Sequence, residues 1–363
     1  MRRWSTGNIS RGGTLIRMGR IQFCHTYEHI ISLENLLLAW KEFLSGKKMR
    51  KDVLEFERNF MMQVITLHTE LANNTYKHSP YYAFNIADPK PRHIHKARVR
   101  DRLLHHVLYR MLYPFFDRTF IADSYSCRQG KGTHKAIDRF QKFSNKVSKN
   151  NTKTVWVLKC DIKKFFASVD QSILIEILKV YISDKNLIVL LSEIIGSFSS
   201  TKEGKGLPLG NLTSQLLVNI YMNEFDQFVK HAIKAKHYIR YADDFVFLSQ
   251  DKDWLETILP EINMFLVQRL QLSLHPDKVF IKTLASGIDF LGWVHFPHHR
   301  VVRTVTKRRI WKRIKDRDGK RETVQSYLGF LSHGNAKRMS DDIRTKYITS
   351  NTLDAPFDKP SIF

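Results

Sequence analysis

The stretch His-Tyr-Ile-Arg-Tyr-Ala-Asp-Asp-Phe-Val-Phe-Leu, residues 237–248, places two neighbouring carboxylates between two short apolar runs. Apolar, aromatic-rich runs on either side of a short polar tip predict a β-hairpin. Asp243 and Asp244 would lie at its tip. An uncompensated charge in so apolar a setting is costly, so the pair favours a bound cation.

A third carboxylate follows a second apolar strand. Residues 154–159 are predicted to form a strand that ends at Cys160 and Asp161. Packing this strand beside the hairpin would gather the three acids at one place. Carboxylate oxygens suit Mg²⁺, and two such ions can activate a hydroxyl, align a triphosphate and neutralise its leaving oxygens. One acid after a strand, or one solvated pair, is usually a turn feature; the combination favours nucleotidyl transfer.

The rest of the chain mixes helices and strands, which indicates an α+β or mixed α/β core. A strand is expected over 81–86, followed by a turn over 88–92. Pro114 is expected to stop the helix that precedes it. Helical spacing of apolar residues is found over 32–40, 51–73, 99–113, 131–147, from about 171 onward and over 213–228.

The composition favours a nucleic-acid partner. Among 363 residues, 59 Lys and Arg stand against 35 Asp and Glu, a formal charge of +24. No stretch approaches the roughly 18 apolar residues that span a bilayer, and no signal peptide opens the chain, so we expect a soluble cytoplasmic protein without membrane contact. The cysteines, Cys24, Cys127 and Cys160, are too scattered for zinc or a disulfide framework.

The acidic motifs resemble those of reverse transcriptases. Tyr241-Ala242-Asp243-Asp244-Phe245 is similar to their Tyr-x-Asp-Asp signature, and residues 161–166 are similar to their strand-ending aspartate motif. The resemblance covers roughly residues 28–300 and continues in order through 89–92, 100–102, 124–130, 209–215, 274–278 and 290–292. It implies a right-hand polymerase with fingers, a palm of antiparallel sheet plus helices, and a short helical thumb.

One motif narrows the subgroup. Group II intron and retron polymerases usually carry Gln-Gly-x-x-x-Ser-Pro, whereas this chain has Leu209-Gly210 followed by Ser214-Gln215. The variant resembles prokaryotic reverse transcriptases of diversity-generating retroelements and related defence-associated, unknown-group enzymes. Leucine offers only apolar contact near the nucleotide, so weaker checking of the base pair is expected. The resemblance to the retroelement subgroup implies that copying is error-prone at template adenines. Mutagenic retrohoming and antiphage defence with a dedicated noncoding RNA both remain open.

The resemblance divides the chain into four segments. They are a basic N-terminal lead-in (1–27), N-terminal helices and fingers (28–153), a palm (154–297), and a basic helical thumb with its tail (298–363).

The resemblance also implies site roles. Asp161 and Asp243 would ligate Mg²⁺, or substituting Mn²⁺, with the Ile162 carbonyl; Asp244 would assist on the primer side and Lys278 would supply a proton. Expected contacts to the deoxynucleoside triphosphate are Lys90, Arg92, Phe166, Leu209, Gly210 and Gln215, with Phe166 excluding a 2′-hydroxyl unless it is only a core residue. Expected contacts to the RNA template and DNA primer are Arg128, Tyr241, Phe290, Leu291 and Gly292.

After Phe296 the sequence becomes strongly basic. Apolar Ile310, Trp311 and Ile314 interleave with cations, as suits a thumb helix that binds a duplex through its phosphates. The cations expected to make these contacts include Arg308, Arg309, Lys312 and Arg313.

Two rival functions are considered. RNA-dependent RNA polymerases generally have glycine before the paired aspartates and a polar residue at the place of Phe166, so they fit less well. A catalytically silent nucleic-acid-binding protein on a polymerase scaffold is disfavoured because all three carboxylates are intact. The resemblance leaves open the priming mechanism, an accessory protein and the oligomeric state.

Overall fold

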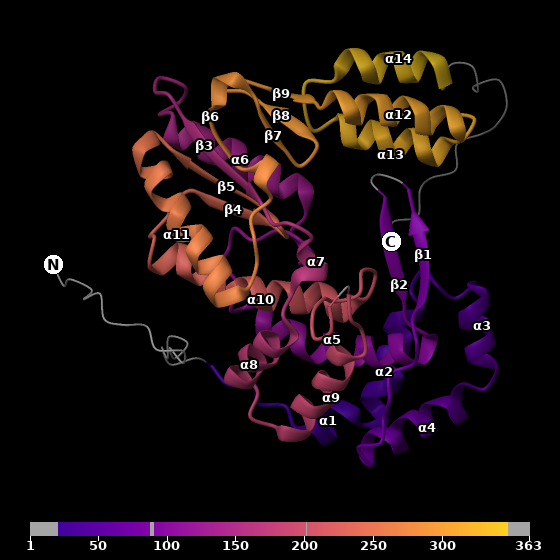
Figure 1. Ribbon diagram of the computed structural model, residues 1–363. Coiled ribbons are helices and arrows are strands. Elements are labelled where there is room, and N and C mark those ends of the chain that lie inside the picture. Colours follow the sequence, from indigo (N-terminus) through magenta and orange to yellow (C-terminus); the bar gives the residue numbers. More distant parts are fainter. Residues whose placement is uncertain (1–20, 88–90, 201, 348–363) are drawn as a thin grey trace, which may run out of the picture.

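A computed structural model describes residues 21–87, 91–200 and 202–347. The predicted hairpin and the predicted strand lie side by side in one antiparallel sheet, in the order β4-β5-β3-β6 (Figure 1). Its strands are β3 Trp156–Asp161, β4 Tyr238–Tyr241, β5 Asp244–Ser249 and β6 Phe280–Thr283. The sheet thus brings the two predicted acidic segments together.

Alternate side chains of this sheet enter different cores, as the pleat requires. Leu158 and Phe247 belong to a large core with α8 Gln171–Tyr181, α10 Leu212–His231 and α11 Lys252–Leu270. Val157 and Leu248 belong to a second core with α6 Thr133–Val147. By the same alternation, residues 159, 161 and 244 share the face that α6 covers.

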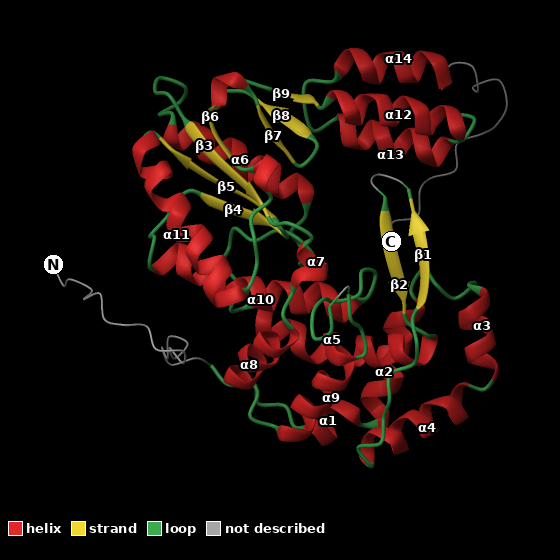
Figure 2. Ribbon diagram, in the orientation of Figure 1, coloured by secondary structure: helices red, strands yellow, loops and turns green. Residues whose placement is uncertain are grey.

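A helical base lies at the other end of the molecule, and a two-stranded hairpin stands up from it (Figure 2). The hairpin consists of β1 Tyr82–Ile86 and β2 Arg92–Lys96. Helices that contribute to the base include α1 Tyr27–Ile31, α2 Leu33–Leu44, α3 Lys51–Arg58, α4 Phe60–Ala72, α5 Val99–Asp117 and α9 Lys185–Gly196.

A smaller sheet precedes the C-terminal helices. It has the order β7-β8-β9, with β7 Ile288–Phe290, β8 Trp293–His295 and β9 Arg300–Val302. The helices α12 Thr304–Asp316, α13 Arg321–Leu331 and α14 Lys337–Tyr347 lie beyond the tip of the β1–β2 hairpin in Figure 1. Trp293 is fully buried in a core with Ile310 and Ile314. The small sheet spans the predicted palm–thumb boundary, and the four-segment division remains a prediction.

The predicted α+β class with an antiparallel sheet is confirmed. Two helix predictions were wrong in detail. The helix expected over 51–73 is divided at Asn59 into α3 and α4. Pro114 does not stop α5, which continues to Asp117. Proline removes one backbone donor, and the burial of Phe115 and Phe116 beyond it offsets that loss.

The predictions of a basic lead-in and of a tail concern residues 1–20 and the residues from 348 onward, which lie outside the described residues. None of the described helices is both long and apolar enough to cross a membrane.

Candidate active site

Three carboxylates meet where β3 and β5 pair. Asp161, the last residue of β3, is the direct cross-strand partner of Asp244, the first residue of β5. The backbone N–H of Ile162 donates to the carbonyl of Asp243 at 3.1 Å. The prediction that the sheet gathers these acids is therefore confirmed for their backbone positions.

A buried ion pair holds the turn that carries Asp243. Arg240 is fully buried, and its guanidinium lies 2.6 Å from the Asp226 carboxylate on α10. Arg240 also donates to the carbonyl of Ala242 at 3.2 Å. Ala242 has φ 56°, a left-handed conformation that non-glycine residues seldom adopt. The ion pair thus helps to fix an unfavourable turn conformation beside the carboxylates.

The carboxylates have unequal surroundings. Asp161 Oδ1 lies 3.0 Å from Lys278 Nζ, and Asp244 Oδ2 lies 3.3 Å from Lys159 Nζ. Asp244 Oδ1 is buried and has no hydrogen-bond partner. Burial is the largest cause that raises the pKa of Asp244 to about 7; nearby Asp161 and Asp243 raise it further, while Lys159 opposes the shift. A buried oxygen without a partner, beside other carboxylates, is suited to a cation.

The donor chemistry fits a hard divalent ion, because carboxylate and carbonyl oxygens are the ligands that Mg²⁺ prefers. Within the described parts of the chain, however, no three carboxylate, imidazole or thiolate groups form a ready ligand set. Lys278 holds Asp161 instead. A metal ion at Asp161 Oδ1 would therefore compete with the Lys278 ammonium.

A second tight turn joins β7 to β8. Leu291 and Gly292 have φ values of 53° and 86°, as a two-residue type I′ hairpin requires. Thr306 Oγ1, at 3.8 Å, is the nearest atom that a Cβ at Gly292 would meet, so glycine serves the backbone angle rather than space. Phe290 is fully buried, whereas Leu291 is half-buried.

The predicted nucleotide-facing turn docks on β2. The N–H of His95 donates to the carbonyl of Leu209 at 3.0 Å. A Cβ at Gly210 would lie 2.8 Å from Ile94 Cγ2, so the close approach of the two segments requires glycine. Leu209 and Gln215 are half-buried and Gly210 is exposed.

Comparison with known proteins decides the family. The profile of the family described as "Reverse transcriptase (RNA-dependent DNA polymerase)" matches residues 86–295, more than half of the chain. The chain belongs to the reverse transcriptases.

Several curated relatives are similar to this chain in sequence. Protein YkfC of Escherichia coli K12 is 28% identical over 65% of this reverse transcriptase and 70% of its own length. The putative COX1/OXI3 intron 1 protein of Saccharomyces cerevisiae is 24% identical, and the match covers 77% of this chain and 41% of that protein. The retron Ec83 reverse transcriptase of Escherichia coli is 32% identical, and the match covers 30% of this chain and 36% of that protein. The chain thus spans less than half the length of the last two.

Phe165 and Phe166, in the short helix α7 Phe165–Ser168, differ in burial. Phe165 is buried in the core of this reverse transcriptase, whereas Phe166 is half-buried and packs against that core. Its ring is the one that remains partly accessible.

Of the other predicted cations, Arg92 and Arg128 lie within the described residues. Lys90 lies outside the described residues, and Arg92 is exposed at the beginning of β2. Arg128 donates to Asp117 Oδ1 at 2.7 Å and to the carbonyl of Ser124 at 3.0 Å, and its side chain is 5% exposed. In this conformation the Arg128 side chain is therefore largely inaccessible to a nucleic acid.

The predicted basic helix is present as α12. Its apolar Ile310 and Ile314 are buried, and Arg308 and Lys312 are exposed; Arg309 and Arg313 are half-buried. The helix thus presents cations on its solvent side. Tyr241, at the end of β4, is half-buried, and its hydroxyl accepts from Thr133 at 3.1 Å.

Lys159 lies at the site although it was not predicted to. Its ammonium donates to the carbonyl of Asp289 on β7 at 2.7 Å while it faces Asp244, and its side chain is 13% exposed. The Asp289 carboxylate in turn lies 2.9 Å from Arg303, the residue before α12. Lys159 thus connects the acidic hairpin with the β7–β8 turn. A lysine within an apolar strand was the available signal.

Proposed function

We propose that this reverse transcriptase makes cDNA from an associated RNA template by nucleotidyl transfer with two divalent ions. The direct pairing of Asp161 with Asp244, next to Asp243, carries the proposal. Asp161, Asp243 and the Ile162 carbonyl would hold Mg²⁺ or Mn²⁺, with Asp244 on the primer side. Bound ions would activate the primer hydroxyl and neutralise charge on the phosphates.

Lys278 would act after it is released from Asp161. Lys278 lies in the short 3₁₀ helix Pro276–Lys278, beside Asp161 at the end of β3. Its side chain is 46% exposed. An ammonium at this place can give a proton to the departing pyrophosphate. The same ammonium neutralises Asp161 in the conformation described here.

The remaining contacts would orient the substrates. Lys90 and Arg92 would neutralise the triphosphate, and Leu209, Gly210 and Gln215 would lie beside the nucleotide. The exposed cations of α12 would follow the phosphates of the template–primer duplex, and the Phe290–Gly292 turn would support the primer end.

Primer extension tests the proposal. Purified protein is supplied with an RNA template, an annealed DNA primer and the four deoxynucleoside triphosphates, with and without Mg²⁺. DNA synthesis that requires Mg²⁺ is expected. Preferential incorporation of ribonucleotides would instead support an RNA polymerase, and template binding without any synthesis would support a non-catalytic protein.

Lys159→Met is expected to lower kcat about 10- to 100-fold, the usual cost of losing a group that orients a metal ligand. The Asp244 carboxylate would lose its counter-charge and β7 its anchor, whereas the template–primer surface would be unchanged. Single-turnover extension and duplex affinity measure the two effects separately. Lys159→Arg should recover part of kcat; an unchanged kcat in Lys159→Met would contradict this positioning role.

Phe166→Ala is expected to relax the preference for deoxynucleotides by about 10- to 100-fold, because removal of the ring makes room for a 2′-hydroxyl. The ratio of kcat/KM for a deoxynucleotide and its ribonucleotide measures the effect. Phe166→Tyr retains the ring and serves as the control. Equal ratios in Phe166→Ala and the wild type would show that Phe166 is only a core residue.

We further propose that the enzyme serves a diversity-generating retroelement in a prokaryotic cytoplasm. The resemblance of the Leu209-Gly210 motif to that of these retroelements supports this setting, although related antiphage defence enzymes share parts of the pattern. Sequencing of cDNA made in vitro should show more misincorporation opposite template adenines than opposite other bases, and Leu209→Gln should reduce it. Uniformly accurate copying of adenines by the wild type would reject the mutagenic role.

A further inference from the structure

A groove lies at the end of the sheet remote from the carboxylates. Its volume is about 770 Å³, and it is formed by α6, the turn between α10 and β4, and the beginning of α11. The strand β5 runs from Asp244 at the acidic turn to Ser249 in the groove, a separation of roughly 17 Å. The groove is therefore separate from the proposed polymerase site.

Cations dominate the groove. Lys146, Lys234 and Lys236 line it, are exposed, and have no acidic partner among the residues that the structure describes. Arg139 is paired with Asp123 at 2.8 Å, and no Asp or Glu lines the groove. Three lysines are thus left to bind an anion.

The groove also has aromatic walls. Phe143 and His237 meet edge to face, with ring centroids 5.1 Å apart, and the half-buried Trp254 lies on another wall. Burial is the main cause that lowers the pKa of His237, and Lys146 and Lys230 lower it further, which favours the neutral imidazole. Rings among lysines suit an unpaired base attached to phosphates.

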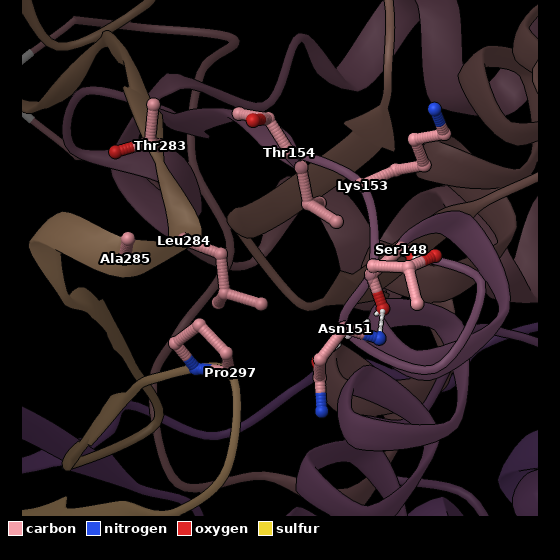
Figure 3. A pocket seen from close by; sticks show the side chains of 10 residues that line it. Ser148, Asn151, Lys153, Thr154, Thr283, Leu284, Ala285 and Pro297 are labelled. Carbon is pink, nitrogen blue, oxygen red and sulfur yellow. Dashed lines mark hydrogen bonds between the residues drawn. The ribbon is translucent and has the colours of Figure 1, made fainter.

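A smaller hollow of about 250 Å³ lies near this groove, at the C-terminal end of α6. Val147 lines the groove and the next residue, Ser148, lines the hollow. Figure 3 shows the polar side chains around the hollow, among them Asn151, Lys153 and Thr283. Hydroxyl, amide and ammonium groups could continue the contacts to a sugar–phosphate chain.

We propose that this groove binds an unpaired segment of an RNA strand, with the three lysines on its phosphates and the aromatic walls against a base. RNA is the partner chosen because the family copies RNA. This contact would hold one segment of the RNA at the end of the sheet remote from the carboxylates, while another segment of the same RNA occupies the polymerase site. It requires no particular chemistry at the carboxylates.

A charge-neutralising variant of the full chain tests the groove. We expect K146Q/K234Q/K236Q to bind a labelled RNA stem–loop with an unpaired loop about 10- to 100-fold more weakly. The dependence of log Kd on log salt should become less steep by about 2, as expected for three lost phosphate contacts on a single strand. Extension of a short primer–template should stay within about twofold of the wild type, because the sites are distant.

The matched control is K41Q/K51Q/K185Q, which removes the same charge from exposed lysines on α2, α3 and α9. Equal weakening by both triple variants would overturn the proposal. Ultraviolet crosslinking of the wild type to the stem–loop is expected to label peptides that contain Phe143 or Trp254, and labelling confined to other regions would also overturn it. Both readouts measure binding, so they remain valid if the protein makes no DNA.

Discussion

Asp243→Asn is expected to reduce DNA synthesis about 10³-fold, because a metal ligand supplies several kcal/mol of transition-state stabilisation. Asparagine keeps the shape of the side chain and removes its charge. The turn is held by Arg240 through the Ala242 carbonyl, so the fold should be retained. Primer extension at saturating Mg²⁺ and nucleotide measures the loss.

Asp253→Asn is the control for that variant. Asp253 is exposed in the first turn of α11 and lies outside the acidic cluster, so synthesis should not change. Synthesis by Asp243→Asn at the wild-type rate would show that Asp243 is not a metal ligand.

Asp226→Ala is expected to destabilise the protein by about 3–5 kcal/mol, since it leaves the charge of Arg240 buried without a partner. Asp226 and Arg240 are both almost completely inaccessible, with side chains 0% and 1% exposed. Tyr238 would also lose its hydrogen bond to Asp226. The midpoint of urea unfolding, followed by circular dichroism, should fall accordingly.

The double variant Asp226→Leu with Arg240→Met separates charge from packing. Removal of both charges should recover part of the stability, because a buried ion pair can be replaced by apolar residues at little cost. The stability should recover only in part, because Arg240 also donates hydrogen bonds to Asn219 and Ser124. If Asp226→Ala unfolded at the same urea concentration as the wild type, the ion pair would not stabilise the hairpin.

The acidic hairpin was predictable because its signals are local. Two apolar runs around Tyr241–Asp244 and a strand ending at Asp161 need no knowledge of distant segments. The gathering of the three acids followed from one assumption, that the strand before Asp161 lies beside the hairpin, and β3 does pair with β5. The register that places Asp161 opposite Asp244 was not predicted. The long helix α10 and the amphipathic basic helix α12 were found by the same local patterns.

Other features depend on contacts between distant segments. The position of Lys159 beside Asp244 and β7 depends on the pleat of β3 and on the placement of the small sheet. The partner of Arg240 lies on another element, so the sequence showed only a charge within an apolar run. The strand β2 was missed because Arg92–Lys96 is polar and has no apolar alternation. Pro114 was wrongly predicted to stop α5, because the burial of the residues that follow it outweighs its local effect on the helix.

The proposed polymerase activity depends on the carboxylates at the β3–β5 pairing, which would hold the catalytic metal ions. Crystals of the enzyme with template, primer, a nonhydrolysable nucleotide and Mn²⁺ test it through anomalous scattering. We predict two manganese peaks contacted by Asp161 and Asp243. Peaks at other residues, or both peaks retained at full height in Asp243→Asn, would show that these carboxylates do not hold the metal ions.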